Sequence, residues 1–267
     1  MKALYNKKAS IIIFCFLLLL IFILSVDKLN RRLIGSNTSG MPAETCLNKD
    51  YYICLDFEES IPENFSHQFD VGKNIKIVKN EEAYQSKGAL YFSSKGTQAY
   101  HQSYITKENI PGSHWGRIFY KIETPTPIAD NHTVLHGTLV ALRGANYEVR
   151  VVDTVQNNIS KQHQYLYNVQ IDNDAEGGVA SDYNWHFSNE WVCVEWYIDH
   201  KSQSYEFFRN GSRIDQISHK VKFPSENSIP SIFTWIKFGL QTYQSNEGMS
   251  GWMDNIAVDS KRIGCGV

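Results

Sequence analysis

The sequence predicts an all-β fold, a sandwich of two packed antiparallel sheets for which a jelly roll is the best match. Runs of residues with high strand propensity recur at short, fairly regular intervals, and Gly, Pro and Asn separate them. Almost no stretch shows the periodicity of an amphipathic helix. With 267 residues the chain is long enough for one such domain and an appendage.

The segment 1–26 stands apart from this fold. Lysines precede an apolar run from Ile11 to Leu24, and charged residues end it from Asp27 onward. The run is long for the hydrophobic region of a signal peptide and short for a membrane span. No small-x-small cleavage pattern follows closely. We expect an N-terminal hydrophobic helix that anchors the chain in a membrane through residues 10–26, with a cleaved signal peptide as the alternative.

Residues 27–44 are polar and rich in Gly, Ser, Asn and Pro, which is typical of a linker, so the jelly-roll domain is expected to span 45–267. An even number of cysteines in an exported domain indicates two disulfides, and four cysteines allow three pairings. We favour Cys46 with Cys54 and Cys193 with Cys265. The same cysteines place the domain outside the cytoplasm, either membrane-anchored or secreted.

Runs of β-branched and aromatic residues mark the expected strands. They are Tyr51–Phe57, Ile75–Val78, Ala89–Ser93, Trp115–Ile122, three runs within 136–170, Trp191–Asp199, Tyr205–Arg209, Ile214–Ile217, Thr234–Tyr243 and Gly251–Val258. Pro125 and Pro127 end the run at Ile122. Trp191–Asp199 and Tyr205–Arg209 read as a hairpin pair followed by an Asn-Gly turn. Gly177 and Gly178 are expected to open a loop.

The stretch from 136 to 170 carries unusually many polar side chains for a plain core, so we interpret it as the floor of a binding cleft. Strand alternation leaves one ambiguity there, because only one of two sets can face the groove. The first set is His163, Tyr165 and Tyr167, and the second is Gln164, Asn168 and Gln170. In the run Thr234–Tyr243, alternation places Lys237, Gln241 and Tyr243 on one face of the strand. It places Ile236, Phe238 and Leu240 on the opposite face, towards the core.

Cleavage of an acidic polysaccharide by β-elimination requires a group that neutralises the uronate carboxylate, a base and a proton donor. The residue types that fill these roles are present at His136, Arg150, His163, Gln164, Tyr167 and Tyr243. Glycoside hydrolysis would instead need two facing carboxylates. Asp153 and Glu195 are available, but the sequence gives them no clear geometry. For any one of these residues a structural role is commoner than catalysis, whereas the set as a whole favours chemistry.

Calcium is the expected metal. Its ligands are carboxylate, hydroxyl and carbonyl oxygens, and Glu58, Ser86 and Asp254 could supply them where the first and last strands meet a Gly turn. No cysteine or histidine pair has zinc spacing. The formal net charge is -2 without a basic stripe, which argues against a nucleic-acid partner.

Several ordered motifs together resemble the fungal cellulose-induced Cip-type proteins and their bacterial relatives, over roughly residues 46–265. They are CLDFEES, WGRIFYKI, HGTLVALRGANYEVRVVDT, KQHQYLYN, WVCVEWYID, YEFFRNG and GWMDNIAVDSKRIGC. The resemblance implies a concanavalin-like β-jelly roll related to glucuronan lyases, with a structural calcium ion and a cleft across the concave sheet. It favours the calcium ligands given above, and as cleft residues it favours His136, Arg150, His163 and Gln164.

The expected function is therefore that of an extracytoplasmic, monomeric protein whose partner is polysaccharide. We predict a lyase that cleaves uronic-acid-containing glycans. Tyr167 or Tyr243 would donate the proton, His136 or His163 would be the base, and the carboxylate would be held by Arg150 with Gln164. The alternative is a non-catalytic carbohydrate-binding module on the same sheet, and a weaker one is a cell-surface domain with a protein ligand.

Overall fold

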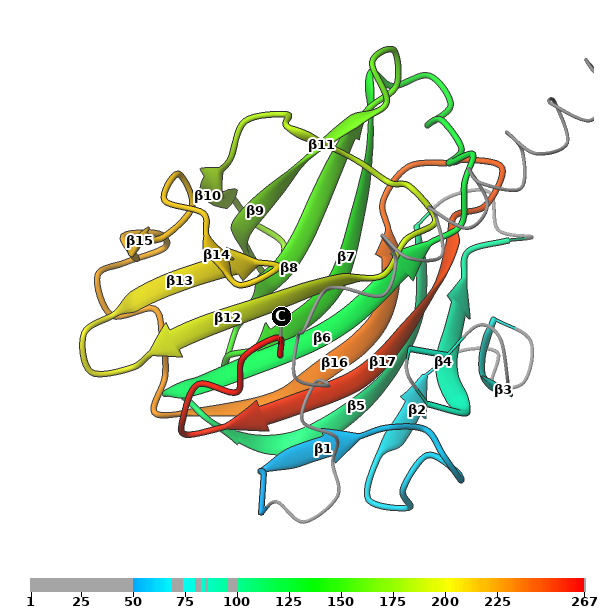
Figure 1. Ribbon diagram of the computed structural model, residues 1–267. Helices are drawn as coiled ribbons and strands as arrows, with labels where there is room; N and C mark the ends of the chain where they lie inside the picture. Colours follow the sequence, from blue (N-terminus) through cyan, green and yellow to red (C-terminus); the bar gives the residue numbers. More distant parts are fainter. Residues whose placement is uncertain (1–49, 69–73, 80–82, 85, 96–99, 267) are drawn as a thin grey trace, which may run out of the picture. The chain divides into compact units, whose positions relative to one another are not determined.

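The computed structural model describes residues 50–68, 74–79, 83–84, 86–95 and 100–266. In these residues the chain forms two antiparallel sheets and no helix, so the predicted all-β sandwich is confirmed (Figure 1). The expected anchor and linker, residues 1–26 and 27–44, lie outside the described residues. No helix within the described ranges is long and apolar enough to cross a membrane.

One sheet, called sheet A, has the strand order β14-β13-β12-β6-β17-β4-β3, with β1 also on β17 and β15 on β13. Its strands are β1 (Ile53–Leu55), β3 (Ile75–Lys79), β4 (Gly88–Ser93), β6 (His114–Ile122), β12 (Val192–Asp199), β13 (Ser204–Arg209), β14 (Ser212–Arg213), β15 (His219–Lys220) and β17 (Ser250–Asp259).

The other sheet, sheet B, has the order β10-β9-β8-β7-β16-β5-β2, with β11 also on β9. Its strands are β2 (Ser66–Gln68), β5 (His101–Pro111), β7 (Val134–Arg143), β8 (Tyr147–Asn157), β9 (Gln162–Ile171), β10 (Glu176–Ala180), β11 (Trp185–His186) and β16 (Ile232–Thr242). The long strands β7, β8 and β16 lie side by side and carry the site described below (Figure 1).

The core lies between the two sheets, because alternate side chains of each strand point inward. Sheet A contributes fully buried residues such as Trp196, Phe207 and Met253, and sheet B contributes residues such as Val149 and Phe238. Hydrogen bonds between the sheets add to this packing. The Tyr205 hydroxyl donates to the Val151 carbonyl at 2.6 Å, and the hydroxyls of Tyr120 and Tyr165 lie 2.5 Å apart.

Three expectations about local structure were wrong. Strand β5 was missed, since its middle carries Lys107, Glu108 and Asn109, which have low strand propensity. The pair Gly177–Gly178 lies inside β10 rather than in a loop. A Cβ atom on Gly178 would lie 2.0 Å from the Tyr167 carbonyl oxygen, so glycine permits this close strand pairing. The run Ile214–Ile217 forms a turn after the short strand β14.

The predicted disulfide between Cys193 and Cys265 is confirmed, with a Cα–Cα distance of 5.9 Å. It ties β12 to the segment that follows β17. Cys46 lies outside the described residues, so its pairing with Cys54 stays a prediction. The predicted hairpin of β12 and β13 is also confirmed, and the turn after it uses positive φ angles at Asn210 and Gly211.

Candidate active site on the outer face of sheet B

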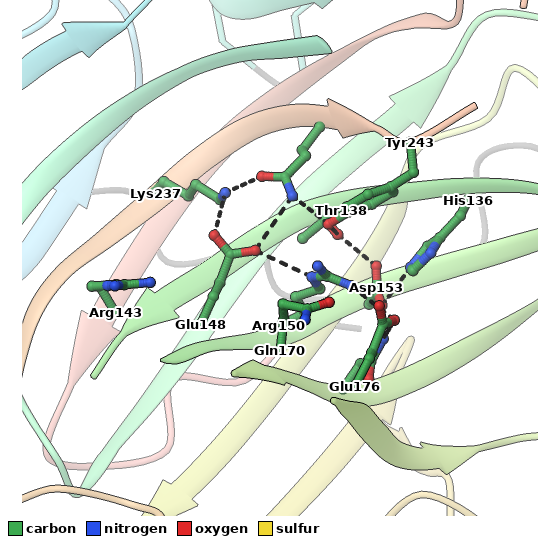
Figure 2. Close-up of polar contacts among 12 residues, drawn as sticks. His136, Thr138, Arg143, Glu148, Arg150, Asp153, Gln170, Glu176, Lys237 and Tyr243 are labelled. Carbon is green, nitrogen blue, oxygen red and sulfur yellow. Dashed lines mark hydrogen bonds and ion pairs between the residues drawn. The ribbon is translucent and has the colours of Figure 1, made fainter. Parts of the chain in front are cut away.

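Irregular strand pairing marks the place where polar side chains gather on the outer face of sheet B. The register shifts between Phe238 and Gln241 on β16, next to Thr138 on β7, and between Arg150 and Asp153 on β8. Bulges of this kind redirect side chains and are common beside active sites. Arg150 and Asp153 are three residues apart, so strict alternation would place them on opposite faces. The bulge brings both into one cluster (Figure 2).

The first half of the cluster is a chain of hydrogen bonds that begins at His136. Its Nε2 lies 2.7 Å from Asp153 Oδ2. Thr138 Oγ1 donates to Asp153 Oδ1 at 2.6 Å, and the same oxygen lies 2.7 Å from the Tyr243 hydroxyl. Since Thr138 uses its proton on Asp153, the Tyr243 hydroxyl donates to Thr138 and accepts from Gln241 Nε2 at 2.5 Å.

This chain sets the protonation of its members. Burial by itself raises the pKa of the Asp153 carboxyl, but His136 and Arg150 outweigh burial and hold that pKa below its usual range. Asp153 is therefore a carboxylate. Since a carboxylate only accepts hydrogen bonds, Nε2 of His136 carries a proton, and Nδ1 is the ring nitrogen left for a basic lone pair. Burial raises the pKa of the Tyr243 hydroxyl well above its ordinary value, so this hydroxyl stays protonated.

The second half of the cluster is a buried ion-pair network around Glu148. Glu148 accepts from Arg150 Nε at 3.1 Å and from Lys237 Nζ at 2.7 Å. Arg150 also donates from Nη1 to Glu176 at 3.0 Å. Burial raises the pKa of Glu148, but Lys237 and Arg150 more than offset it and keep that pKa below its ordinary value. The guanidinium carbon of Arg150 lies 4.4 Å from the centroid of the Tyr243 ring, which joins the two halves.

A pocket of about 410 Å³ opens at this cluster. Its rim carries the ion pair between Arg143 and Asp172. Tyr100 is 56% exposed there, and its ring centroid lies 5.8 Å from that of Tyr243. The lining residues are Tyr100, Gln102, Tyr104, Arg143, Glu148, Arg150, Gln170, Asp172, Trp235, Gln241 and Tyr243. Aromatic faces and a few directed polar groups are what a carbohydrate site requires.

Of the predicted site residues, the structure brings His136, Arg150 and Tyr243 together. Arg150 and Tyr243 line the pocket, and His136 lies next to the lining, against the ring of Tyr243. Gln164 lies on the same outer face, because the pairing runs from His136 through Val155 to Gln164. Two gaps between neighbouring strands separate it from His136, or about 10 Å. Gln164 is not part of the pocket lining.

His163 and Tyr167 lie in the interior between the sheets, away from the pocket, because they share the inward parity of β9. His163 is 1% exposed and stacks on Phe187 with 4.0 Å between ring centroids. Neither of its ring nitrogens has a hydrogen-bond partner among the described residues. Burial lowers the pKa of His163 to about 3 and raises the pKa of Tyr167 above its usual value. The ambiguity of β9 is thus resolved in favour of Gln164, Asn168 and Gln170 on the outer face.

The carboxylate pair considered for hydrolysis, Asp153 with Glu195, does not form. Glu195 lies in β12 of sheet A, where it accepts from Arg262 at 3.0 Å and from the Gly264 amide at 2.9 Å. Its carboxylate therefore holds the C-terminal segment on sheet A.

Sequence reasoning missed Glu148 and Glu176, and it considered Asp153 only for hydrolysis. A signal for Glu148 was present, since it lies two residues before Arg150 and shares its face. The parity predicted for β16 is confirmed. Lys237, Gln241 and Tyr243 meet in the cluster, while the core holds Ile236, Phe238 and Leu240.

The residues predicted for calcium meet in part. Asp254 of β17 is buried, and its Oδ2 accepts from Ser86 Oγ at 2.7 Å and from the Tyr84 amide at 2.8 Å. Burial raises the pKa of Asp254 to about 7. Beside it, the buried Asn255 Oδ1 has no hydrogen-bond partner in the described part of the chain. Glu58 reaches the same loop, accepting from the Lys87 amide at 2.6 Å.

This donor set suits calcium, which takes carboxylate, hydroxyl and amide oxygens together. Within the described ranges, no group of three His, Cys, Asp or Glu side chains could hold a metal. A calcium ion would therefore depend on Ser86 and Asn255 as well as on the carboxylates.

No protein-family model matches the sequence, and no curated protein matches it. Solved structures with a similar fold exist. Cellulose induced protein, Cip1, is 15% identical, with a TM-score of 0.55 over 80% of this chain and 99% of that chain. The similarity confirms, at the level of the fold, the predicted resemblance to Cip-type proteins.

Two glucanases are also similar. A β-glucanase from Bacillus licheniformis is 7% identical, with a TM-score of 0.50 over 78% of this chain and 98% of that chain. The catalytic domain of an endo-1,3-β-glucanase (laminarinase) from Thermotoga petrophila is 12% identical, with a TM-score of 0.50 over 78% and 96%. At these identities the similarities establish a jelly-roll fold.

Proposed function

We propose that this domain acts on polysaccharide and that the pocket on sheet B cleaves uronic-acid-containing chains by β-elimination. One observation carries the proposal. The protonated Tyr243 lies against His136, with 4.3 Å between the ring centroids. The carboxylate of Asp153 sets the tautomer of His136. A proton donor and a base are the two groups that the elimination requires within one site.

In the proposed reaction, His136 Nδ1 takes the proton from C5 of the uronate. The electron pair left on C5 delocalises into the carboxylate and then forms the C4–C5 double bond as the C4–O4 bond breaks. Tyr243 Oη releases its hydrogen bond to Thr138 and gives its proton to the departing oxygen, which becomes the hydroxyl of the released chain. Asp153 stabilises the imidazolium that forms, and Thr138 and Gln241 hold the tyrosine hydroxyl in place.

Directed N–H donors would hold the uronate carboxylate. Arg150 uses Nε and Nη1 on Glu148 and Glu176, which leaves Nη2 for substrate. Arg143 and the amides of the pocket lining are further donors. The charged residues of the lining are two arginines and two carboxylates, so recognition would depend on the direction of these donors rather than on net charge.

The protonation of the carboxylates supports elimination over hydrolysis. Glu148 and Asp153 both lie on the outer face of β8, so they are the two carboxylates to compare with the catalytic pair of a glycosidase. A glycosidase needs one of its carboxyl groups protonated, with a raised pKa. Here ion pairs lower the pKa of both Glu148 and Asp153. Burial raises the pKa of the Tyr243 hydroxyl beside them, so this group keeps the proton that a general acid needs.

A non-catalytic carbohydrate-binding site is the second candidate. The aromatic rings of Tyr100, Tyr104 and Trp235 line the same pocket and could stack on sugar rings. This alternative predicts that the protein binds the glycan without turnover. The names of the similar structures, a cellulose induced protein and two glucanases, fit either candidate.

The proposal includes an extracytoplasmic location, membrane-anchored or secreted, which the disulfide between Cys193 and Cys265 supports. It also includes a structural calcium ion held by Asp254, Ser86, Asn255 and Glu58. The ion would neutralise the buried carboxylate of Asp254 and tie β17 to the loop that precedes β4.

The test is incubation of the full-length chain with glucuronan, alginate and pectate, with and without calcium. Absorbance reports unsaturated uronate ends. We expect a rise with at least one polymer, lost in His136→Ala and in Arg150→Ala and retained in Lys220→Ala, a change at an exposed position on sheet A. Folded wild-type protein that yields no unsaturated product from any polymer, yet binds one of them, would leave the binding alternative.

A further inference from the structure

Lys237 is a buried cation that lies beside the pocket without lining it. Its side chain is 3% exposed, and its Nζ atom lies 4.9 Å from the ring centroid of Tyr104 and 5.5 Å from that of Trp235. Both rings belong to the pocket lining, whereas Lys237 does not. A substrate in the pocket would therefore meet these rings and not the ammonium group. In the proposed elimination this buried cation has no role of its own.

Two hydrogen bonds hold the ammonium group. Nζ of Lys237 donates to Glu148 Oε2 at 2.7 Å and to the side-chain oxygen of Gln241 (Figure 2). Burial lowers the pKa of Lys237, and the carboxylate of Glu148 opposes this effect. A buried charge is tolerated when it is paired and hydrogen-bonded, as it is here. Lys237 thus contacts Gln241, which in turn contacts the proposed proton donor, Tyr243.

The partners of Gln241 fix which end of its amide faces Tyr243. An ammonium group only donates hydrogen bonds, so the amide oxygen Oε1 must face Lys237. A carboxylate only accepts them, so Nε2 must face Glu148, 3.4 Å away. Nε2 then donates its second hydrogen to the Tyr243 hydroxyl at 2.5 Å. In a reversed amide, the NH₂ group would oppose the ammonium group, and the oxygen would oppose the carboxylate.

This orientation matters at the moment when Tyr243 gives up its proton. The hydroxyl then becomes a phenolate, which is stabilised by the hydrogen bonds that it accepts. Thr138 uses its own proton on Asp153 and has none for the phenolate. Nε2 of Gln241, by contrast, already donates to this oxygen. A hydrogen bond accepted at Oε1 also polarises the amide and strengthens donation from Nε2.

We infer that Lys237 is a positioning residue for the proton donor: it directs the Gln241 amide so that Nε2 stabilises the phenolate of Tyr243. The inference rests on the proposed function of the pocket. Lys237 acts through Gln241 on the step that breaks the C4–O4 bond, and it does not act on substrate binding. It is therefore expected to matter only when the departing oxygen needs a proton.

The experiment measures the steady-state kinetics of unsaturated product formation from glucuronan by the full-length Lys237→Met variant. Methionine is similar in shape to the lysine stem but donates no hydrogen bond. We expect kcat to fall about 10- to 100-fold, the loss of one hydrogen bond to a charged group. KM should stay nearly unchanged, because Lys237 does not line the pocket. Lys237→Arg, which keeps the charge and the donors, should recover part of kcat. Lys220→Ala, at an exposed position on sheet A, should change neither constant.

A second substrate separates positioning from a general loss of structure. It is a glucuronan oligosaccharide that carries a nitrophenyl ether at O4 of its terminal uronate. Nitrophenolate is a weak base and departs without a proton, so it needs no general acid. Lys237→Met should cleave this substrate at the wild-type rate, as should Tyr243→Phe. Slow cleavage of both substrates by folded Lys237→Met protein would assign Lys237 a structural role and overturn the inference.

Lys237 and Gln241 should behave as one unit. Gln241→Met removes the amide and keeps the ion pair between Lys237 and Glu148. Its loss of kcat on glucuronan should be at least that of Lys237→Met, and combining the two changes should cost no further activity. Losses that multiply in the double variant would contradict the inference. Should Lys237→Met not fold, Gln241→Met with the two substrates decides the outcome in the same way.

The amide can also be observed without turnover. In ¹⁵N-labelled protein, the side-chain N–H signals of Gln241 are identified by their loss in Gln241→Met. Their hydrogen exchange should be slow in the wild type and faster in Lys237→Met, and unchanged exchange would refute positioning by Lys237. Failure of the proposed function is distinct, since wild-type protein that makes no unsaturated product refutes the lyase whatever the amide does. Unsaturated product formed by Lys237→Met at the wild-type rate refutes only the positioning role.

Discussion

The ring of Tyr243 lies against the imidazole of His136, with 4.3 Å between the ring centroids and 31° between the ring planes. Thr138 and Asp153 also connect the two residues through hydrogen bonds. The proposed donor and base thus approach substrate from the same side, the outer face of sheet B. This relationship restricts the sugars that the site can cleave.

A donor and a base on one side favour syn elimination, in which H5 and the leaving O4 lie on the same face of the sugar. Glucuronate and mannuronate have this configuration, and galacturonate does not. We therefore expect the full-length chain to cleave glucuronan or mannuronate-rich alginate faster than pectate. Initial rates of unsaturated product formation measure the difference. Equal or faster cleavage of pectate would contradict the geometry.

Asp153 is expected to act by positioning His136. The change Asp153→Asn keeps the shape but removes the charge that fixes the tautomer and stabilises the imidazolium, so kcat should fall by about 10²–10⁴-fold. Substrate affinity should change little, because Asp153 does not line the pocket. Asp182→Asn, at an exposed position, is the matched control. A fall in affinity with unchanged kcat would assign Asp153 a binding role instead.

His163 is expected to affect stability rather than activity. Its pKa is about 3 in the folded chain against a usual 6.5. As the pH falls from about 6.5 towards 3, the unfolded chain binds a proton at this residue and the folded chain does not, so stability falls. The variant His163→Leu should lose this dependence.

His163→Leu should also raise stability by about 1–2 kcal/mol at pH 7, because it removes buried ring nitrogens without partners. Urea denaturation at pH 7 and pH 5 measures both effects. Activity should stay within a factor of about two, since the residue lies outside the pocket. A large loss of activity in folded His163→Leu protein would return this histidine to the list of candidate catalytic groups.

The sequence predicted the strands that build the site better than it predicted which way their side chains point. On β16, Ile236, Phe238 and Leu240 are apolar and Lys237 and Gln241 are polar, so alternation identified the faces. On β9 both sets contain polar groups, and Tyr165 is an amphipathic residue that fills the core with its ring and bonds through its hydroxyl. Residue types alone could not assign those faces.

The bulge on β8 explains why Asp153 was missed as the partner of His136. Asp153 lies three residues from Arg150, a spacing that alternation assigns to opposite faces of the sheet. Only the shifted register places both residues on the outer face. The ion-pair network around Glu148 was missed for a different reason. Its partners come from β16 and β10, which are distant in sequence, so no local pattern reports them.

Calcium should stabilise the fold through Asp254. When calcium is about 100-fold above its Kd, a site present only in the folded state adds about 2.7 kcal/mol to the free energy of unfolding. We expect the melting temperature of the full-length chain to rise with calcium at pH 7.5, and Asp254→Ala to abolish the rise. Asp259→Ala, on the same strand, should keep it. A calcium effect that survives Asp254→Ala would place the ion elsewhere.

Mass spectrometry of the glucuronan fragments made by the full-length chain and by Tyr243→Phe tests the central claim most directly. Elimination gives fragments with an unsaturated end that are lighter by one water than hydrolysis products. We predict such fragments from the wild type, and a rate at least about 10²-fold lower from Tyr243→Phe, which keeps its ring and its packing. Fragments that carry the added water, or an undiminished rate in Tyr243→Phe, would contradict the assignment of this pocket as a lyase centre.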